Sequence, residues 1–475
     1  ERRFLRGLYR NLRVEALVRV PCLAAGWAGI LLLYAEWCGA GSACLDSIFM
    51  SPLIRALGRS TPGPPLAEAL LDLGTYPVRT RDEADAICAA LTALDQVPPC
   101  GVSPTPEGTD CPATALYMLA SLFQRVENPE AHELLAARGL PLLREAYQRR
   151  LGAATRHRED LMFLLKVFAM YPDRGGYELI LSAAQRGMWA EDTLWQTVFA
   201  LFDHKHPYAI ELVEALGKAL PHGFIAIALL DCANGLALRG ERFVHPFESE
   251  AGRALLEEYL TGSESRWFSY AHSATAALPF LAPEARGRLM ALALDHSSSR
   301  VQLEAAWAST KMGSKSGLKL LKRACLDARR AGIARAYLEE LELKDEIPDE
   351  AWEPDLLAQA ELCMWLSHPH EFGEAPEEIE IVDTRRLSWL PTDDERQVWI
   401  LRYRYSPEHA EEGRPNEGLA MVGSITYSLH GECPPTRPAE EVYALHCCWE
   451  LQINQDPRAP KERSVDAGLT LLGLE

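Results

Sequence analysis

Polar side chains that can bind ligands or move protons gather in the carboxy-terminal part of the chain. Segments 397–405, 421–430 and 442–451 alternate like strands, and one face of their sheet carries arginines, histidines, a thiol and a carboxylate. The residues predicted on this face are Arg402, Arg404, Ser424, Thr426, Ser428, His430, His446, Cys448 and Glu450. Such a face can bind an anionic ligand or supply acid/base groups. A solvated sheet face has the same composition, and we favour that interpretation. The candidate ligand-binding residues are Arg402, Arg404, His430 and His446.

Two histidine pairs have a spacing that places both imidazoles on one side of an extended segment. They are His204 with His206, and His368 with His370. Zinc needs three or four ligands, and neither pair has a cysteine or carboxylate partner at a fixed spacing. Each pair stands where a predicted helix ends, a position that histidine favours. We therefore expect turn and capping roles, no metal site and no cofactor.

Motifs of the familiar catalytic and nucleotide-binding sites are missing from the sequence. No G-x-G-x-x-G follows a predicted strand, and G-x-x-x-x-G-K-[ST], H-E-x-x-H, G-x-S-x-G and the EF-hand loop are absent. Enzymatic activity is therefore uncertain, and a non-catalytic role is favoured.

Size and charge narrow the class of protein. A chain of 475 residues is too long for one ordinary core, unless it is the quasi-linear core of stacked repeats. The formal net charge is −19, which repels phosphate backbones and disfavours a nucleic-acid partner. The 12 cysteines include no C-x-x-C and mostly lie in apolar runs, as core cysteines of a reducing compartment do. A bridge between Cys100 and Cys111 in an oxidising compartment is the alternative.

The amino-terminal region allows two interpretations. Six arginines precede an apolar run at residues 20–34, an order typical of a signal anchor. The run is shorter than the roughly 20 residues that a bilayer requires, contains Pro21 and is followed by Glu36. We favour a buried helix at the end of a helical array and a cytoplasmic protein. A membrane anchor through residues 20–34 is the alternative.

From residue 113 to about residue 343 the sequence predicts helix after helix with short breaks. Apolar residues recur at helical spacing, as in 140–151 and 224–238, and proline or glycine separates the segments. Two helices together take roughly 35 to 45 residues, the period of HEAT and armadillo repeats. We predict three parts: a helical region with Pro/Gly-rich linkers at 1–112, a helical repeat array at 113–373 and an antiparallel β-rich domain at 374–475.

One helix pair, Ser297 to Gly332, has the clearest repeat pattern. Met312-Gly313-Ser314 separates two helices, and Val301, Ala305 and Ala308 form one apolar stripe. In the second helix the stripe is Leu318, Leu321, Cys325 and Ala328, whereas Lys319, Lys322, Arg323 and Arg329 are left for water. An Arg-Val opening, small interior residues and a glycine stop resemble a HEAT repeat. The resemblance implies an α-solenoid of degenerate HEAT-like helix pairs, followed by a small antiparallel β or α+β domain.

The carboxy-terminal two fifths also resemble bacterial HEAT-repeat (armadillo-type) proteins with a β-rich end, through YLEEL, WLSHPHEFG, EIEIVDTR and YALHCCWEL. The resemblance brings no catalytic residues. It favours a non-catalytic scaffold or adaptor that binds a protein or peptide on the concave face of the solenoid, with the carboxy-terminal sheet as a cap. A small-ligand protein or enzyme, similar to lyases built on HEAT-like repeats, is the first alternative. A membrane-tethered scaffold is the second.

Overall fold

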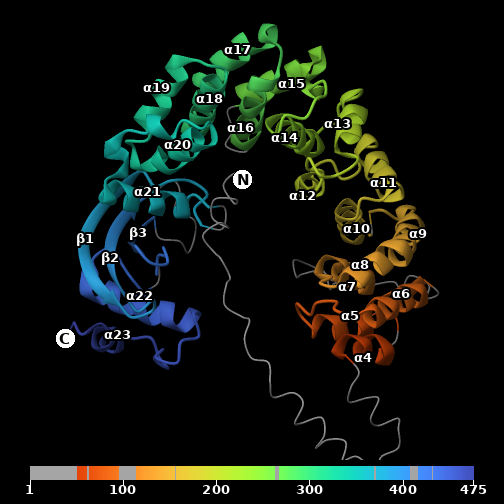
Figure 1. Cartoon of the computed structure of the whole chain (residues 1–475), viewed down its shortest axis with the longest axis horizontal. Helices are drawn as coiled ribbons and strands as arrows, with labels where there is room; N and C mark the ends of the chain where they lie inside the picture. Colours follow the sequence, from red (N-terminus) through yellow and green to blue (C-terminus); the bar gives the residue numbers. More distant parts are fainter. Residues whose placement is uncertain are drawn as a thin grey trace, which may run out of the picture. The chain divides into compact units, whose positions relative to one another are not determined.

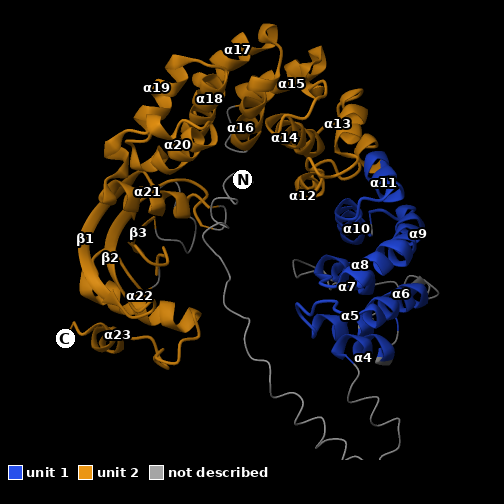
Figure 2. Ribbon diagram, in the orientation of Figure 1, with its two compact units in different colours: residues 1–182 blue, residues 183–475 orange. Residues whose placement is uncertain are grey.

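The computed structural model describes residues 51–60, 62, 64–95, 114–155, 157–262, 267–368, 371–406, 416–429 and 432–474. The apolar run at 20–34 and the candidate His430 lie outside the described residues. Figure 2 shows two compact units, one ending at Ser182 and one beginning at Ala183. The boundaries predicted at 112/113 and 373/374 stay predictions. Within the described ranges, no helix combines the length and the apolar character needed to cross a bilayer.

The first unit is built from helices. They are α4 (Pro52–Arg59), α5 (Pro64–Leu71), α6 (Arg81–Asp95), α7 (Ala115–Leu122), α8 (Pro129–Leu134), α9 (Leu140–Leu151), α10 (Arg158–Met170) and most of α11 (Arg174–Gln185). Local capping explains where several of them begin. The Ser51 hydroxyl accepts the Ile54 N–H at 3.2 Å, and Asn128 accepts the N–H groups of Glu130 and Ala131. A proline follows each cap, where its missing N–H costs nothing.

The second unit begins with ten helices of the same kind within the described residues. They are α12 (Leu194–Ala200), α13 (Ala209–Gly217), α14 (Phe224–Leu238), α15 (Glu250–Thr261), α16 (Phe268–Ala277), α17 (Pro283–Leu294), α18 (Ser299–Lys311), α19 (Lys315–Ala324), α20 (Ala328–Glu340) and α21 (Pro354–Leu366). Helices α14, α16, α18 and α20 pack on one another in that order, and α15 and α17 cover them from one side (Figure 1).

Most of the predicted helices are confirmed, two of them to the residue: α9 and α14. The predicted second helix of the 297–332 pair is wrong at its end. Its apolar stripe predicts a helix that includes Ala328, but α19 ends at Ala324 and α20 begins at Ala328. The reason is Asp327, whose carboxylate accepts the Arg329 N–H at 3.0 Å and caps a new helix.

Helices α18 and α19 approach closely at Gly317. A Cβ at this position would lie 2.7 Å from the Ala306 carbonyl oxygen and 2.8 Å from the Thr310 nitrogen, both backbone atoms of α18. Because neither atom can move without moving α18, only glycine fits this contact.

Gly317→Ala is expected to lower the free energy of unfolding by about 1–3 kcal/mol, since the added methyl pushes α19 away from α18. Gly287→Ala is the matched control, because Gly287 lies inside α17 with open space around it. Alanine there is expected to stabilise the protein by up to about 1 kcal/mol through helix propensity. Urea unfolding followed by circular dichroism measures both changes. Equal effects of the two substitutions would contradict the close approach.

A three-stranded antiparallel sheet follows α21. Its strands are β1 (Glu378–Trp389), β2 (Asp394–Arg404) and β3 (Glu417–Val422), in the order β1-β2-β3. Helix α21 packs on the face with Leu401, Tyr403, Ala420 and Val422. Helix α22 (Ala439–Ile453) packs on the opposite face, which has Val398, Ile400, Leu419 and Met421, and α23 (Val465–Leu472) packs on α22. The carboxy-terminal part is therefore α+β, with a sheet covered on both faces.

Three predicted strands need correction. The strand predicted at 442–451 is wrong, because these residues lie in α22, which follows Pro438 and has Glu440 and Glu441 in its first turn. The strand predicted at 378–382 continues to Trp389. The strand predicted at 421–430 stops at Val422, because Gly423 turns the chain with a φ of +107°.

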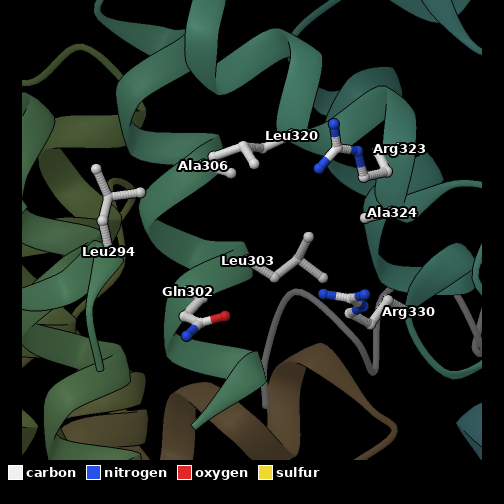
Figure 3. Close-up of a pocket in the computed structure, with 8 residues that line it drawn as sticks. All are labelled: Leu294, Gln302, Leu303, Ala306, Leu320, Arg323, Ala324 and Arg330. Atoms are coloured by element: carbon white, nitrogen blue, oxygen red, sulfur yellow. The ribbon is translucent and has the colours of Figure 1, made fainter. Parts of the chain in front are cut away.

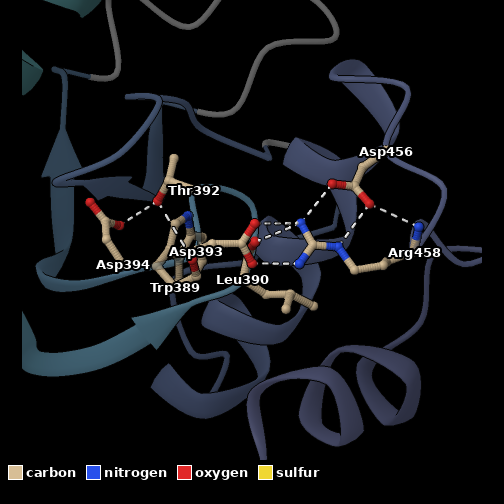
Figure 4. A network of polar contacts seen from close by, with 7 residues as sticks. All are labelled: Trp389, Leu390, Thr392, Asp393, Asp394, Asp456 and Arg458. Atoms are coloured by element: carbon tan, nitrogen blue, oxygen red, sulfur yellow. Dashed lines mark hydrogen bonds and ion pairs between the residues drawn. The ribbon is translucent and has the colours of Figure 1, made fainter.

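An arginine links the β1–β2 turn to the loop that follows α22. The Arg458 guanidinium donates to Asp393 Oδ1 at 2.5 Å, to Asp456 Oδ2 at 2.7 Å and to the Leu390 carbonyl at 3.0 Å (Figure 4). Hydrogen bonds from Arg458 lower the pKa of Asp456 to about 2. Both acids are thus occupied by one cation.

Candidate functional site

The two candidate arginines of β2 are held by carboxylates of the neighbouring strands. Arg402 pairs with Glu380 of β1, and it also donates to the Pro435 carbonyl at 3.2 Å. Arg404 pairs with Glu378 and Glu417, each at 3.1 Å. The strand register places these partners directly opposite one another. An anionic ligand would therefore have to displace existing ion pairs.

His446 lies in α22 and is buried, with 1% of its surface exposed. Its Nε2 lies 2.9 Å from the Ile425 carbonyl and donates to it. Burial lowers the pKa of His446 to about 4. The structure thus places Arg402 and Arg404 at the surface of the sheet and His446 in its core, so these three do not share a solvated face. Their ligand-binding role stays a prediction.

Ser424, His446 and Glu450 contain the groups of a hydrolytic triad but not its geometry. The Ser424 hydroxyl donates to Glu450 Oε1 at 2.7 Å, and Trp389 Nε1 donates to Oε2 at 3.0 Å. In a triad the imidazole accepts the serine proton and the carboxylate orients the imidazole. Here the imidazole donates to a backbone carbonyl, and its Nε2 is 4.0 Å from Glu450. These bonds fasten the loop after β3 to α22.

The burial of His446 predicts a loss of stability in acid. A histidine with a folded-state pKa of about 4 and an ordinary pKa of 6.5 stabilises the fold fully above pH 6.5, and this contribution falls as the pH drops toward 4. His446→Gln keeps a donor for the Ile425 carbonyl but does not titrate. We expect the variant to lose about 2–3 kcal/mol less than the native protein between pH 7 and pH 4.5.

Urea unfolding at the two pH values measures this difference. His245 has a pKa lowered to about 4 by burial as well, but it is present in both proteins and cancels. Equal losses in both proteins would contradict the assignment of the acid sensitivity to His446.

A hollow of about 210 Å³ opens between α17 and α19, which both pack on α18. Leu294 ends α17 on one side, and Arg323 and Arg330 lie on the other, with Leu303 of α18 between them (Figure 3). Leu294 and Leu320 border the hollow and are 39% and 42% exposed. The hollow therefore has a mostly apolar end, which also carries Gln302, and a basic end.

The segment that forms the basic end has a charge opposite to that of the whole chain. Between residues 315 and 330 it has one acid, Asp327, and six basic residues: Lys315, Lys319, Lys322, Arg323, Arg329 and Arg330. Arg330 donates to Asp327 at 2.7 Å, and Lys322 pairs with Glu346 at 2.8 Å. Arg323 is exposed and makes no ion pair with any residue that the structure describes. Its charge is available to a partner.

Sequence patterns predict the helices around this hollow but not the hollow itself. They assign Arg323 to the solvated face of α19 and give Leu320 no role. The feature of the sequence that could have indicated the hollow is the position of Leu320. This leucine lies beside the apolar stripe of Leu318 and Leu321 and next to Lys319.

Two further sources of evidence for a functional site are possible metal ligands and similarity to known proteins. Within the described ranges, no three or more His, Cys, Asp or Glu side chains are grouped so that they could hold a metal ion. No family model, no curated protein and no solved structure matches the chain. We take the hollow between α17 and α19 as a candidate site on its geometry alone.

Proposed function

We propose that the protein is a non-catalytic scaffold or adaptor that binds another protein, and that its stacked helices form a HEAT-like α-solenoid. The observation that carries this proposal is the hollow between α17 and α19, where Leu294 and Leu320 remain exposed beside an open space of about 210 Å³. Apolar side chains that line a concavity can bury an apolar side chain of a partner. Stacked helix pairs present such surfaces without a catalytic pocket.

We place the partner contact at the hollow and not along the stacked helices to which α14 and α18 belong. In α18, Val301 and all residues from Leu303 to Thr310 are buried. In α14, Ile225 to Leu230 are buried as well. Little of either helix is exposed. The part of α18 that borders the hollow, with Gln302, Leu303 and Ala306, is open to it, so we place the contact there.

The polar groups considered for an enzymatic function support the same proposal. Arg402 and Arg404 are engaged by carboxylates, and His446 is buried against a carbonyl group. Catalysis requires groups that reach a bound substrate. None of these three is placed to do so without rearrangement.

Affinity purification tests the proposal. The immobilised full chain is exposed to a lysate of the organism that makes it, and bound proteins and small molecules are identified by mass spectrometry. Leu320→Asp is expected to lose the specific protein partner. Leu326→Asp is the matched control, because Leu326 lies in the turn after α19, is 47% exposed and does not line the hollow. A bound metabolite without a protein partner, or partners that persist with Leu320→Asp, would overturn the proposal.

A further inference from the structure

One end of the hollow is apolar, which indicates part of what its partner must present. Leu294, Leu303, Ala306 and Leu320 contribute side chains to the lining, and the volume of about 210 Å³ exceeds that of any single aliphatic side chain. An apolar side chain of a partner that enters it leaves water, which favours binding.

The other end of the hollow is basic. Arg323 and Arg330 line it opposite Leu294, and only Arg330 has an acidic partner among the described residues. Lys319 and Arg329 add positive charge nearby on the same helices. The chain as a whole has a net charge of −19, which is enough to keep it soluble. A local cluster of basic residues is therefore not needed for solubility. Arginine in particular binds carboxylates through two parallel hydrogen bonds.

We propose that the hollow between α17 and α19 binds an acidic peptide segment of a partner protein, with one apolar side chain inserted beside Leu294 and Leu303 and a neighbouring carboxylate on Arg323. This inference rests on the proposed scaffold function and specifies its partner. Nucleic acid is a poorer fit, because phosphates would use the arginines but leave the exposed leucines uncovered. The charge complementarity and the apolar anchor together favour a peptide.

A selection from a random peptide library on the immobilised full chain tests this inference. Enriched peptides are expected to combine an apolar residue with flanking Asp or Glu. Arg323→Glu and Leu320→Asp are each expected to weaken the binding of a selected, fluorescently labelled peptide about tenfold or more. Arg329→Glu makes the same charge change outside the lining, and a loss of only about twofold is expected from the weaker long-range field.

The outcomes separate this inference from the scaffold function. Selected peptides that are neutral or basic, or that bind Arg323→Glu as well as the native chain, would overturn the acidic partner and leave the scaffold function standing. Competition of the selected peptide by a single-stranded oligonucleotide at equal concentration would overturn it in favour of phosphate binding. Self-association in sedimentation that Arg323→Glu abolishes would assign the hollow to a second copy instead. If no peptide is enriched and no lysate partner depends on Leu320, both proposals fail.

Discussion

Trp389→Ala is expected to lower the free energy of unfolding by about 4 kcal/mol, one of the two largest effects that we predict. Trp389 is the last residue of β1 and is fully buried in the core between the sheet and α22. Removing a buried indole leaves a cavity that neighbouring side chains fill only in part, which costs about 3–5 kcal/mol. Urea unfolding followed by circular dichroism measures the loss. A loss below about 1 kcal/mol would show that the sheet and α22 do not share one core.

The polar contribution of Trp389 can be separated from its packing. Trp389→Phe keeps an aromatic ring but removes the donor to Glu450, whose carboxylate is 1% exposed. We expect a cost of about 2 kcal/mol, because a buried charged acceptor loses one of its hydrogen bonds. Glu450→Gln is the control: its amide can accept from Trp389 and donate to Ser424, so a cost under about 1 kcal/mol is expected. Combined with Glu450→Gln, Trp389→Phe should cost less than it does alone.

The sequence predicts helices well where one stripe of each faces the core. Helix α9 has Leu140, Leu143, Ala146 and Tyr147 buried and arginines in its last turn, so both its period and its end can be read from the residue types. Prolines and glycines between helices give the breaks. Apolar spacing alone fails at Asp327. It predicts one helix through this position, whereas the Asp327 carboxylate caps the start of a new helix.

The sheet shows a second limit. The alternation along β2 predicts its two faces correctly, with Leu401 and Tyr403 on one and Val398 and Ile400 on the other. Helix α22 is predicted as a strand because it is buried from Val442 to Cys448, so no solvated stripe marks its helical period. His446 and Glu450 resemble solvated positions by residue type, yet each has buried hydrogen-bond partners. Alternation of residue types cannot distinguish these cases.

The hollow could not be predicted, because it depends on the spacing of α17 and α19 across α18. That spacing is set by contacts such as Gly317 against the backbone of Ala306 and Thr310, which the sequence does not reveal. Two residues of the site, Leu320 and Arg323, are visible as residue types. Their proximity to Leu294 follows only from the packing.

Helices α18 and α20, which border the hollow, share a buried polar cluster with α16. Glu304 of α18 is 0% exposed and accepts a hydrogen bond from the Tyr337 hydroxyl of α20, and His272 Nε2 of α16 lies 3.1 Å from the same carboxylate oxygen. Each of three successive stacked helices thus contributes one group. Tyr337→Phe is expected to cost about 2 kcal/mol, because a buried carboxylate loses a donor. Glu304→Leu is expected to cost about as much, because it leaves the Tyr337 hydroxyl buried without this acceptor.

The double variant distinguishes a coupled cluster from two independent packing sites. Removing both groups together leaves neither of them buried without the other, so Glu304→Leu with Tyr337→Phe should cost about 2 kcal/mol less than the sum of the single losses. Urea unfolding of the four proteins gives this coupling energy, and Glu339→Gln, an exposed acid on α20, should change stability by less than about 0.5 kcal/mol. Strict additivity would mean that packing alone aligns α16, α18 and α20. Coupling would mean that Glu304, next to Leu303, helps to fix the position of α18, the helix that a partner's side chain would contact in the hollow.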